Sequence, residues 1–192
     1  AVTVLAGNAP LLSLKGPAGN VIAGQCTAFG VEFLAPDGKP SMTRAQAVLR
    51  LTSSSATSHL FSDPNCAVSI PEAGLAVREF SRTASFFLMD KGIAGTEIGA
   101  EMADYAASTL AVEGVAGPVA SIAFTDSADE IRAERCYGPI LIRTLDPFGN
   151  QARPGLPVPI LISLEGSSAS KAGLYSSSTC AGEPIGATSI NK

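Results

Sequence analysis

The side chains that could carry out acid–base or nucleophilic chemistry are few in this sequence and lie far apart. The only histidine is His59, in the segment SHLFSDPNC beside Leu60 and Phe61. No serine or cysteine stands in a nucleophile motif such as G-x-S-x-G, and no glycine-rich loop has phosphate-binding spacing. The letters SASK at 168–171 match S-x-x-K, but this serine-rich stretch predicts a loop rather than the helix which that motif requires. We therefore expect no catalytic residues and no enzymatic activity.

An acidic cluster is a candidate cation site. The segment DSADE places Asp126, Asp129 and Glu130 shortly after Gly117 and Pro118. Calcium takes six to eight oxygen ligands, so these carboxylates are candidate calcium ligands, and an ordinary charged turn is the alternative. We expect no other cofactor. The cysteines lack the close spacing of zinc sites and there is a single histidine, so no transition-metal site is expected either.

Two serine-rich stretches, LTSSSATS and LEGSSASK, predict the tips of loops between strands. Such loops are most often simply solvated, and the alternative is a surface that contacts a glycan or a cell surface. The residues that form this candidate contact surface are Ser53, Ser54, Ser55, His59, Ser167 and Ser168.

The cysteines belong to an internal repeat. SHLFSDPNC ends at Cys66 and returns as AGLYSSSTC, which ends at Cys180. In the same way, LLSLKGPAGNVIAGQC ends at Cys26 and SIAFTDSADEIRAERC ends at Cys136. Four cysteines admit three pairings, and the repeat selects Cys26 with Cys66 and Cys136 with Cys180. Closing a loop of about 40 residues stabilises a domain by roughly 4 kcal/mol. Such bonds persist in oxidising compartments, so we expect an extracellular or cell-surface location.

The composition favours an all-β fold. Apolar residues make up 46% of the chain, and short apolar runs alternate with Gly, Pro, Asn, Asp and Ser, which is typical of a sandwich or barrel. Only 16% of residues are charged and the net charge is −4, which argues against nucleic-acid and membrane-surface partners. No apolar run approaches the roughly 18 residues of a membrane span.

The segment GAEMADYAASTL at 99–110 is rich in helix formers. The repeat register nevertheless assigns it to the last two strands of the first domain, because Ile98, Ala100 and Met102 alternate on one face. A short helix that crosses between strands is the alternative.

The repeat offset of about 110 residues matches one sandwich domain per copy. We expect two tandem Ig-like β-sandwich domains, at 9–117 and 118–192, with the second lacking its last strands. The opening VTVLAGNAP resembles the closing phrase STLAVEGVAGP, so residues 1–8 are interpreted as the closing strand of a preceding or neighbouring domain. The candidate donor strand consists of Ala1, Val2, Thr3, Val4 and Leu5.

The order of these elements resembles the tandem Ig-like repeat domains of large bacterial surface and secreted proteins. The resemblance rests on the cysteine, the strand that ends in a glycine turn, the serine-rich hairpin, the aromatic strand ASFFLMDK and the closing TLAVEG. It implies a role in stalks, adhesins or fibres. The core tryptophan of true immunoglobulin domains is absent, and the resemblance carries over no functional residues.

Three functions remain open from the sequence. The first is a structural or adhesive module of a bacterial surface assembly. In this function the chain is part of a longer array, with further Ig-like domains as partners. The second is a filament subunit, in which residues 1–5 of one copy add a strand to the unfinished domain of the next. That unfinished domain lacks more residues than one strand supplies. The third is a module that binds glycans or a cell surface through the serine-rich tips.

Overall fold

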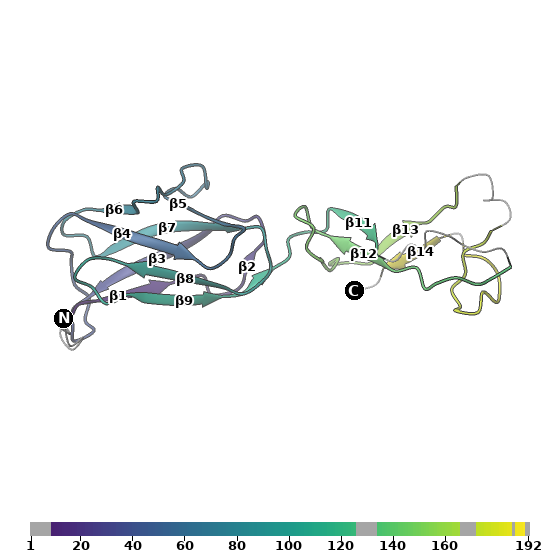
Figure 1. Cartoon of the computed structure of the whole chain (residues 1–192), viewed down its shortest axis with the longest axis horizontal. Helices are drawn as coiled ribbons and strands as arrows, with labels where there is room; N and C mark the ends of the chain where they lie inside the picture. The colour runs from purple at the N-terminus through teal and green to yellow at the C-terminus, as the bar shows by residue number, and fades with distance from the viewer. Residues whose placement is uncertain (1–8, 126–133, 166–171, 186, 191–192) are drawn as a thin grey trace, which may run out of the picture. The chain divides into compact units, whose positions relative to one another are not determined.

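The computed structural model describes residues 9–125, 134–165, 172–185 and 187–190. Within these ranges every regular element is a β-strand and nearly all strand pairs are antiparallel, so the all-β prediction is confirmed (Figure 1). Contacts divide the chain into two compact units, Ala1–Gly117 and Pro118–Lys192, called unit 1 and unit 2 below. The described residues contain no helix long and apolar enough to cross a membrane.

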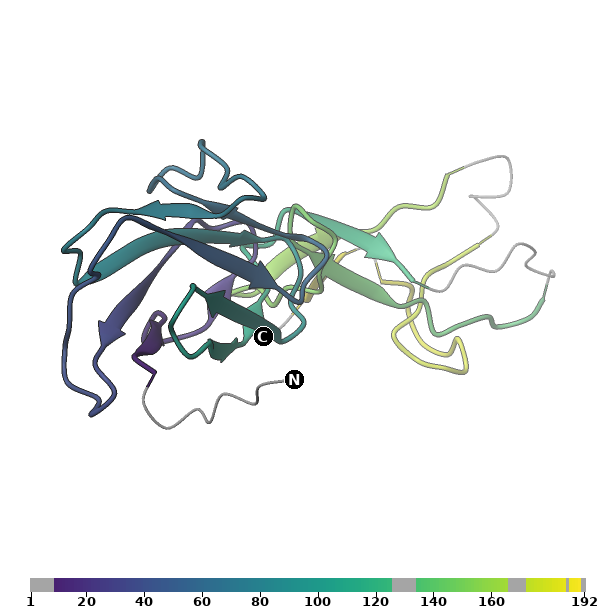
Figure 2. The same ribbon diagram turned by 60° about the vertical axis from the view of Figure 1, so that its left-hand side comes forward.

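Unit 1 is a β-sandwich of two four-stranded sheets (Figures 1 and 2). The first sheet contains, in spatial order, β1 (Leu11–Lys15), β3 (Thr27–Leu34), β7 (Thr83–Asp90) and β5 (Ser58–Phe61). The second contains β6 (Leu75–Val77), β4 (Ala47–Ser53), β8 (Thr96–Glu101) and β9 (Ser108–Val112). Two short strands, β2 (Val21–Ile22) and β10 (Gly114–Val115), pair in parallel.

The core of unit 1 follows from the two-residue alternation of its strands. In β3, Phe29, Val31 and Phe33 are buried while the residues between them are not. Phe29 lies directly opposite Phe86 of β7, and their rings stack with centroids 5.5 Å apart. Burial of each such side chain contributes about 1.5–3 kcal/mol, so these central strands hold the two sheets together.

The helix-like segment at 99–110 forms strands, as the repeat register predicts. Ile98 and Ala100 of β8 are fully buried and Met102 is nearly so, while β9 pairs with β8 along its length. A turn separates the two strands, with Asp104 at φ 64° and the Tyr105 N–H bonded to the carbonyl of Met102 at 3.2 Å. Burial of the alternating apolar face outweighs the helix propensity of the segment.

Five successive connections cross between the two sheets. The chain changes sheet at each step from β3 to β4, β5, β6, β7 and β8. The serine-rich tip is the connection from β4 to β5, and the loop that carries Cys66 lies in the connection from β5 to β6. Both sequence features of interest therefore lie at places where the chain leaves one sheet for the other.

The outer edges of the first sheet are covered by neighbouring backbone. At β1 the Leu12 N–H donates to the Ala106 carbonyl at 3.3 Å. At β5 the Ile70 N–H donates to the Leu60 carbonyl at 2.9 Å. Covered edges remove unpaired backbone groups that otherwise recruit other strands.

Unit 2 contains two separate two-stranded antiparallel sheets. One pairs β11 (Ser121–Phe124) with β12 (Ile142–Leu145), and the other pairs β13 (Val158–Leu161) with β14 (Ala187–Ile190). In the part of unit 2 that the structure describes, no third strand joins either pair.

Candidate functional site

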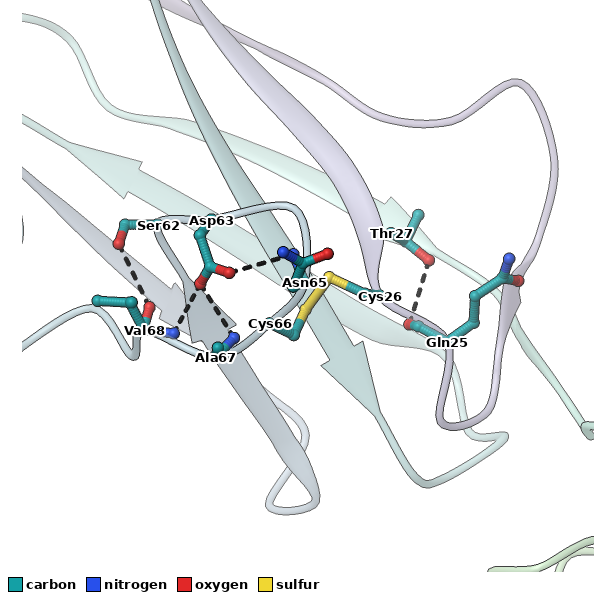
Figure 3. Close-up of a disulfide and its surroundings, with 9 residues drawn as sticks. All are labelled: Gln25, Cys26, Thr27, Ser62, Asp63, Asn65, Cys66, Ala67 and Val68. Atoms are coloured by element: carbon teal, nitrogen blue, oxygen red, sulfur yellow. Dashed lines mark hydrogen bonds between the residues drawn. A yellow bond between two sulfur atoms is a disulfide. The ribbon is translucent and has the colours of Figure 1, made fainter.

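Both disulfides have the pairing that the repeat predicts. Cys26, directly before β3, bonds to Cys66 in the loop after β5, with Cα atoms 5.8 Å apart (Figure 3). Cys136 bonds to Cys180 in unit 2, with Cα atoms 5.6 Å apart. In unit 1 the bond therefore ties the start of a central strand to the loop that follows an edge strand.

The loop around Cys66 is organised by the carboxylate of Asp63 (Figure 3). Its Oδ1 accepts hydrogen bonds from the backbone N–H of Ala67 at 3.0 Å and of Val68 at 2.6 Å, and Oδ2 accepts one from Asn65 at 3.1 Å. These bonds, led by that of Val68, hold the pKa of Asp63 below its ordinary value. The ionised carboxylate thus fixes the turn in which Cys66 takes a φ of 51°.

The loop around Cys180 has the same arrangement, with a hydroxyl in place of the carboxylate. Ser177 Oγ accepts a hydrogen bond from the Ala181 N–H at 3.0 Å, as Asp63 does from Ala67. The Ser177 carbonyl accepts the Cys180 N–H at 3.2 Å, and the equivalent bond in unit 1 is 3.1 Å. Cys180 takes a φ of 53°. The two cysteine loops therefore share one local geometry.

Three serines of the first tip lie together. Ser58 Oγ donates to Ser53 Oγ at 2.6 Å and to the Ser55 carbonyl at 3.0 Å, while the exposed His59 follows on β5. They border an open hollow of about 260 Å³. Its lining residues are Ser53, Ser55, Ser58, His59, Leu60, Ser69 and Ile70. The structure thus brings the predicted contact residues Ser53, Ser55 and His59 to one surface.

Ser54 is separated from this group. Its Oγ accepts a hydrogen bond from the Glu97 N–H of β8 at 2.9 Å, and its own N–H donates to the Glu97 carbonyl at 3.0 Å. It borders a second open hollow of about 470 Å³, lined by Ser54, Gly95, Thr96, Glu97, Ala111, Val112 and Glu113. Ser54 therefore extends the pairing of β4 with β8 and does not face the other tip serines' hollow.

A buried carboxylate anchors the tip. Asp90, at the end of β7, accepts a hydrogen bond from Thr57 Oγ1 at 2.6 Å and from the Gly92 N–H at 2.9 Å through Oδ1. Its Oδ2 accepts one from Thr96 Oγ1 at 3.0 Å. Burial raises the pKa of Asp90. The hydrogen bonds together lower this pKa by more than burial raises it, so the pKa lies below its ordinary value. One ionised group therefore joins the tip to the β7–β8 turn.

Sequence reasoning missed this anchor. The one available signal was that Asp90 stands two residues before Gly92, a spacing typical of turns. Thr57 and Thr96 gave no signal, because only the fold brings them to the carboxylate. Ser69 lies at the tip hollow because its backbone forms an isolated antiparallel β-bridge with Phe61. The loop that crosses from β5 to β6 brings these two residues together.

Several predicted site residues lie outside the described residues. They are the candidate calcium ligands Asp126, Asp129 and Glu130, the second-tip residues Ser167 and Ser168, and the candidate donor strand Ala1, Val2, Thr3, Val4 and Leu5. The calcium site, the second contact tip and strand donation therefore stay predictions. Among the residues that the structure describes, no group of three or more His, Cys, Asp and Glu side chains is placed to hold a metal ion.

Comparison with known proteins gives matches of structure only. No protein-family model matches the chain, and no curated protein sequence matches it. The S-layer protein SbsC matches 83% of this chain and 19% of its own length, at 16% identity and a TM-score of 0.40. The β-glucuronidase of Parabacteroides merdae matches 56% of this chain and 12% of its own, at 9% identity and a TM-score of 0.40. A conjugative transposon lipoprotein of Bacteroides eggerthii matches 54% of this chain and 95% of its own, at 11% identity and a TM-score of 0.39.

Proposed function

We propose that this chain is a non-enzymatic structural and adhesive module of a bacterial extracellular surface assembly, built from disulfide-tied Ig-like repeats. The observation that carries the proposal is the pair of cysteine loops, at Cys66 and Cys180, which share one geometry in two all-β units. Disulfides persist in oxidising compartments, which supports a location outside the cell or on its surface. Further domains of the same kind are the proposed partners.

The buried carboxylates support a structural role. Asp146 is buried, and its Oδ1 accepts the N–H groups of Phe148 and Asn150, both at 2.9 Å. Asp90 is occupied in the same way by donors from the tip and the β7–β8 turn. A general acid or base needs an oxygen within reach of a substrate proton. Oxygens that are buried and already bonded to turns stabilise loops instead.

Labelling of intact cells tests the proposal. Antibodies against unit 1 are applied to cells that produce the natural protein, before and after permeabilisation, and the native protein is weighed with and without reduction. We expect labelling of intact cells and a mass gain of four hydrogens on reduction, one pair for each disulfide. Labelling that appears only after permeabilisation, or four free thiols in the native protein, contradicts the proposal.

Binding of a glycan or cell surface is a second candidate function, favoured by the hollow beside the first tip. Ser53, Ser55, Ser58 and Ser69 bring hydroxyls to this surface, and the imidazole of His59 lies edge-on to Phe61 with ring centroids 6.5 Å apart. Hydroxyls beside a partly aromatic surface suit polar, ring-shaped ligands such as sugars. A glycan array probed with the full chain and with a Ser55→Ala, His59→Ala variant tests this function. Equal binding by both proteins, or none by either, excludes it.

A filament assembled by strand donation is a third candidate, favoured by the free strand edges of unit 2. In its described part, β12 and β13 each have a partner strand on one side only, and on the other side of β12 the Thr144 carbonyl accepts the Ala152 N–H at 2.9 Å. A free edge accepts an added strand through backbone hydrogen bonds. Electron microscopy of the full chain and of a chain without residues 1–8 tests this candidate, which requires filaments from the first and none from the second.

A further inference from the structure

Phe80 is held at the surface of unit 1 in a strained backbone conformation. It lies in the loop between β6 and β7, its side chain is 68% exposed, and its φ is 60°. A positive φ is unusual for a bulky residue, and such strain persists only where the surrounding structure imposes it. The fold therefore places an aromatic ring in water at a cost in backbone strain.

The buried Thr43 imposes this conformation on the loop. Its Oγ1 donates to the Arg78 carbonyl at 2.7 Å and accepts the Ser81 N–H at 3.0 Å. The Thr43 carbonyl accepts the Phe80 N–H at 2.9 Å, and the Thr43 N–H donates to the Ser81 carbonyl at 3.0 Å. These bonds fix the backbone on both sides of the ring. A side chain on a fixed backbone loses less conformational entropy when a partner binds it.

Three arginines accompany the ring. Arg78 and Arg82 belong to the same loop, and Arg44 directly follows the threonine that holds it. All three are exposed, and Glu79 is the one acidic residue within 78–82. Among the residues that the structure describes, none of these arginines forms an ion pair. Phe80 and the three arginines are called the Phe80 surface below, and it suits a partner that offers an apolar hollow with carboxylates beside it.

Unit 1 itself carries a hollow of that kind. The open hollow of about 470 Å³ is lined in part by Gly95, Ala111 and Val112, which are small or apolar, and by Glu97 and Glu113. Both glutamates are exposed, and neither forms an ion pair within the described part of the chain. Its volume lies in the range of pockets that enclose small ligands, about 300–1,000 Å³, so it has room for a phenyl ring.

The two surfaces lie at opposite ends of β4. Val77, the last residue of β6 before the Phe80 loop, lies opposite Ala47 at the start of β4. Ser54, directly after the end of β4, is bonded through its backbone and side chain to Glu97. The seven residues of β4, at about 3.4 Å each, separate the two surfaces by roughly 20 Å (Figure 1). Phe80 therefore cannot reach the hollow of its own chain.

We propose that the Phe80 surface of one copy docks into the hollow of a second copy. The ring contacts Ala111 and Val112 of the second copy, and the arginines lie beside its Glu97 and Glu113. The proposal rests on the proposed function, because it names a second copy of unit 1 as one of the partner domains.

This contact is heterologous, since the two surfaces differ and lie at opposite ends of the unit. Each copy uses its ring toward one neighbour and its hollow toward the other. Repetition of such a contact gives an open row of copies unless the rotation between them closes a ring. The contact joins side chains and requires no exchange of strands.

Sedimentation of the full chain over a range of concentrations tests the contact. We expect the chain to associate, and we expect Phe80→Asn to weaken association at least about tenfold, because the ring is the central anchor. Asn tolerates a positive φ, so this variant keeps the loop. Val68→Asn is the matched control, because Val68 is 57% exposed in another loop of unit 1, and it should associate as the natural chain does. Thermal unfolding of both variants checks that they are folded.

A mixing experiment tests the head-to-tail geometry. Ala111→Arg fills the hollow and repels the arginines, and this exposed position accepts a larger side chain. We expect neither Ala111→Arg nor Phe80→Asn to associate alone. Mixed, they offer one intact ring and one intact hollow, so we expect a dimer with one copy of each and nothing larger. Raising the salt from about 0.1 M to about 1 M shortens the Debye length from about 10 Å to about 3 Å and should weaken this dimer.

Three results overturn the proposal. The first is a natural chain that stays monomeric at every concentration. The second is association that Phe80→Asn leaves unchanged, which assigns it to another surface. The third is a mixture of the two variants that stays monomeric, which shows that the ring and the hollow are not partners. None of these results affects the surface labelling that tests the proposed function, so the two proposals fail separately.

Discussion

The Asp90 side chain joins the serine-rich tip to the β7–β8 turn, beside the hydrogen bond from the Lys91 N–H to the Thr57 carbonyl at 3.4 Å. Its three donors come from the serine-rich tip, the β7–β8 turn and the first residue of β8, at 2.6, 2.9 and 3.0 Å. A buried carboxylate is costly unless hydrogen bonds satisfy its oxygens, and here both oxygens are bonded. The tip hollow with Ser55 and Ser58 depends on this anchor, because Thr57 lies between these two serines.

Replacement of Asp90 by Asn tests the anchor. Asn keeps an acceptor oxygen for Thr57 and Gly92 but places an N–H₂ group against the donor hydroxyl of Thr96, so we expect the free energy of unfolding to fall by about 1–3 kcal/mol. Urea denaturation followed by circular dichroism measures the change. The exposed Asp104→Asn serves as control, with an expected effect within about 0.5 kcal/mol. Equal effects of the two substitutions contradict a specific role for Asp90.

The lowered pKa of Asp90 also predicts a dependence of stability on pH. Because the folded pKa lies below the unfolded one, the contribution of Asp90 is fully present above the unfolded value of about 3.9. It is lost as the pH falls through the lower folded pKa. We expect the stability difference between the natural chain and Asp90→Asn to shrink as the pH falls below about 4. A difference that stays constant as the pH falls below this value contradicts the assignment.

At the scale of elements, the pairing of β6 with β4 depends on Gly74. This residue has a φ of 108°, and a Cβ built on it lies 2.6 Å from the Leu49 carbonyl oxygen and 2.8 Å from Val48 Cγ1. We expect Gly74→Ala to destabilise unit 1 by roughly 1–3 kcal/mol, through backbone strain and displacement of β6. Gly19→Ala is the matched control, since a Cβ there meets nothing within 4 Å. Thermal unfolding of both variants gives the comparison, and a Gly74→Ala midpoint equal to that of Gly19→Ala refutes it.

The disulfide of unit 1 joins the start of β3 to the loop after β5. Cys26 and Cys66 are separated by 40 residues. Loss of a cross-link across such a loop raises the conformational entropy of the unfolded chain and so lowers the free energy of the unfolded state by about 4 kcal/mol. We expect the Cys26→Ala, Cys66→Ala variant to lose about that much stability in the unfolding of unit 1. The Cys136→Ala, Cys180→Ala variant is the control, and it should leave the transition of unit 1 in place. A loss below about 1 kcal/mol in the first variant contradicts the entropic account.

The sequence predicted which segments form strands better than it predicted which strands pair with one another. Alternation at Ile98, Ala100 and Met102 outweighed the helical composition of 99–110, and the repeat selected the cysteine pairs, because both signals are local or periodic. The order in which β5 and β6 join opposite sheets was not predictable, since short strands with weak alternation do not specify their partners. The Asp90 anchor was missed for the same reason, because its donors are distant in sequence.

At the scale of the whole molecule, the buried core belongs to unit 1. The cluster of buried apolar residues begins at Leu12 and ends at Met102, so every member lies within unit 1. The described strands of unit 2 contribute fewer buried apolar side chains, with Ala152 and Ile160 as its buried hydrophobic residues among those described. A unit of this size whose buried core lies entirely within it has the burial needed for independent folding.

We therefore expect a fragment of residues 9–117 to fold alone. It contains both sheets of the sandwich, the Cys26–Cys66 bond and the Asp90 anchor, so it retains the interactions that stabilise unit 1. Its thermal unfolding should be a single cooperative transition. The midpoint should lie within about 8 °C of the unit 1 transition in the full chain, a shift that corresponds to a difference of about 1 kcal/mol in the free energy of unfolding for a domain of this size. Circular dichroism and the dispersion of amide NMR signals measure both points. A fragment that melts without cooperativity shows that unit 1 depends on residues outside 9–117.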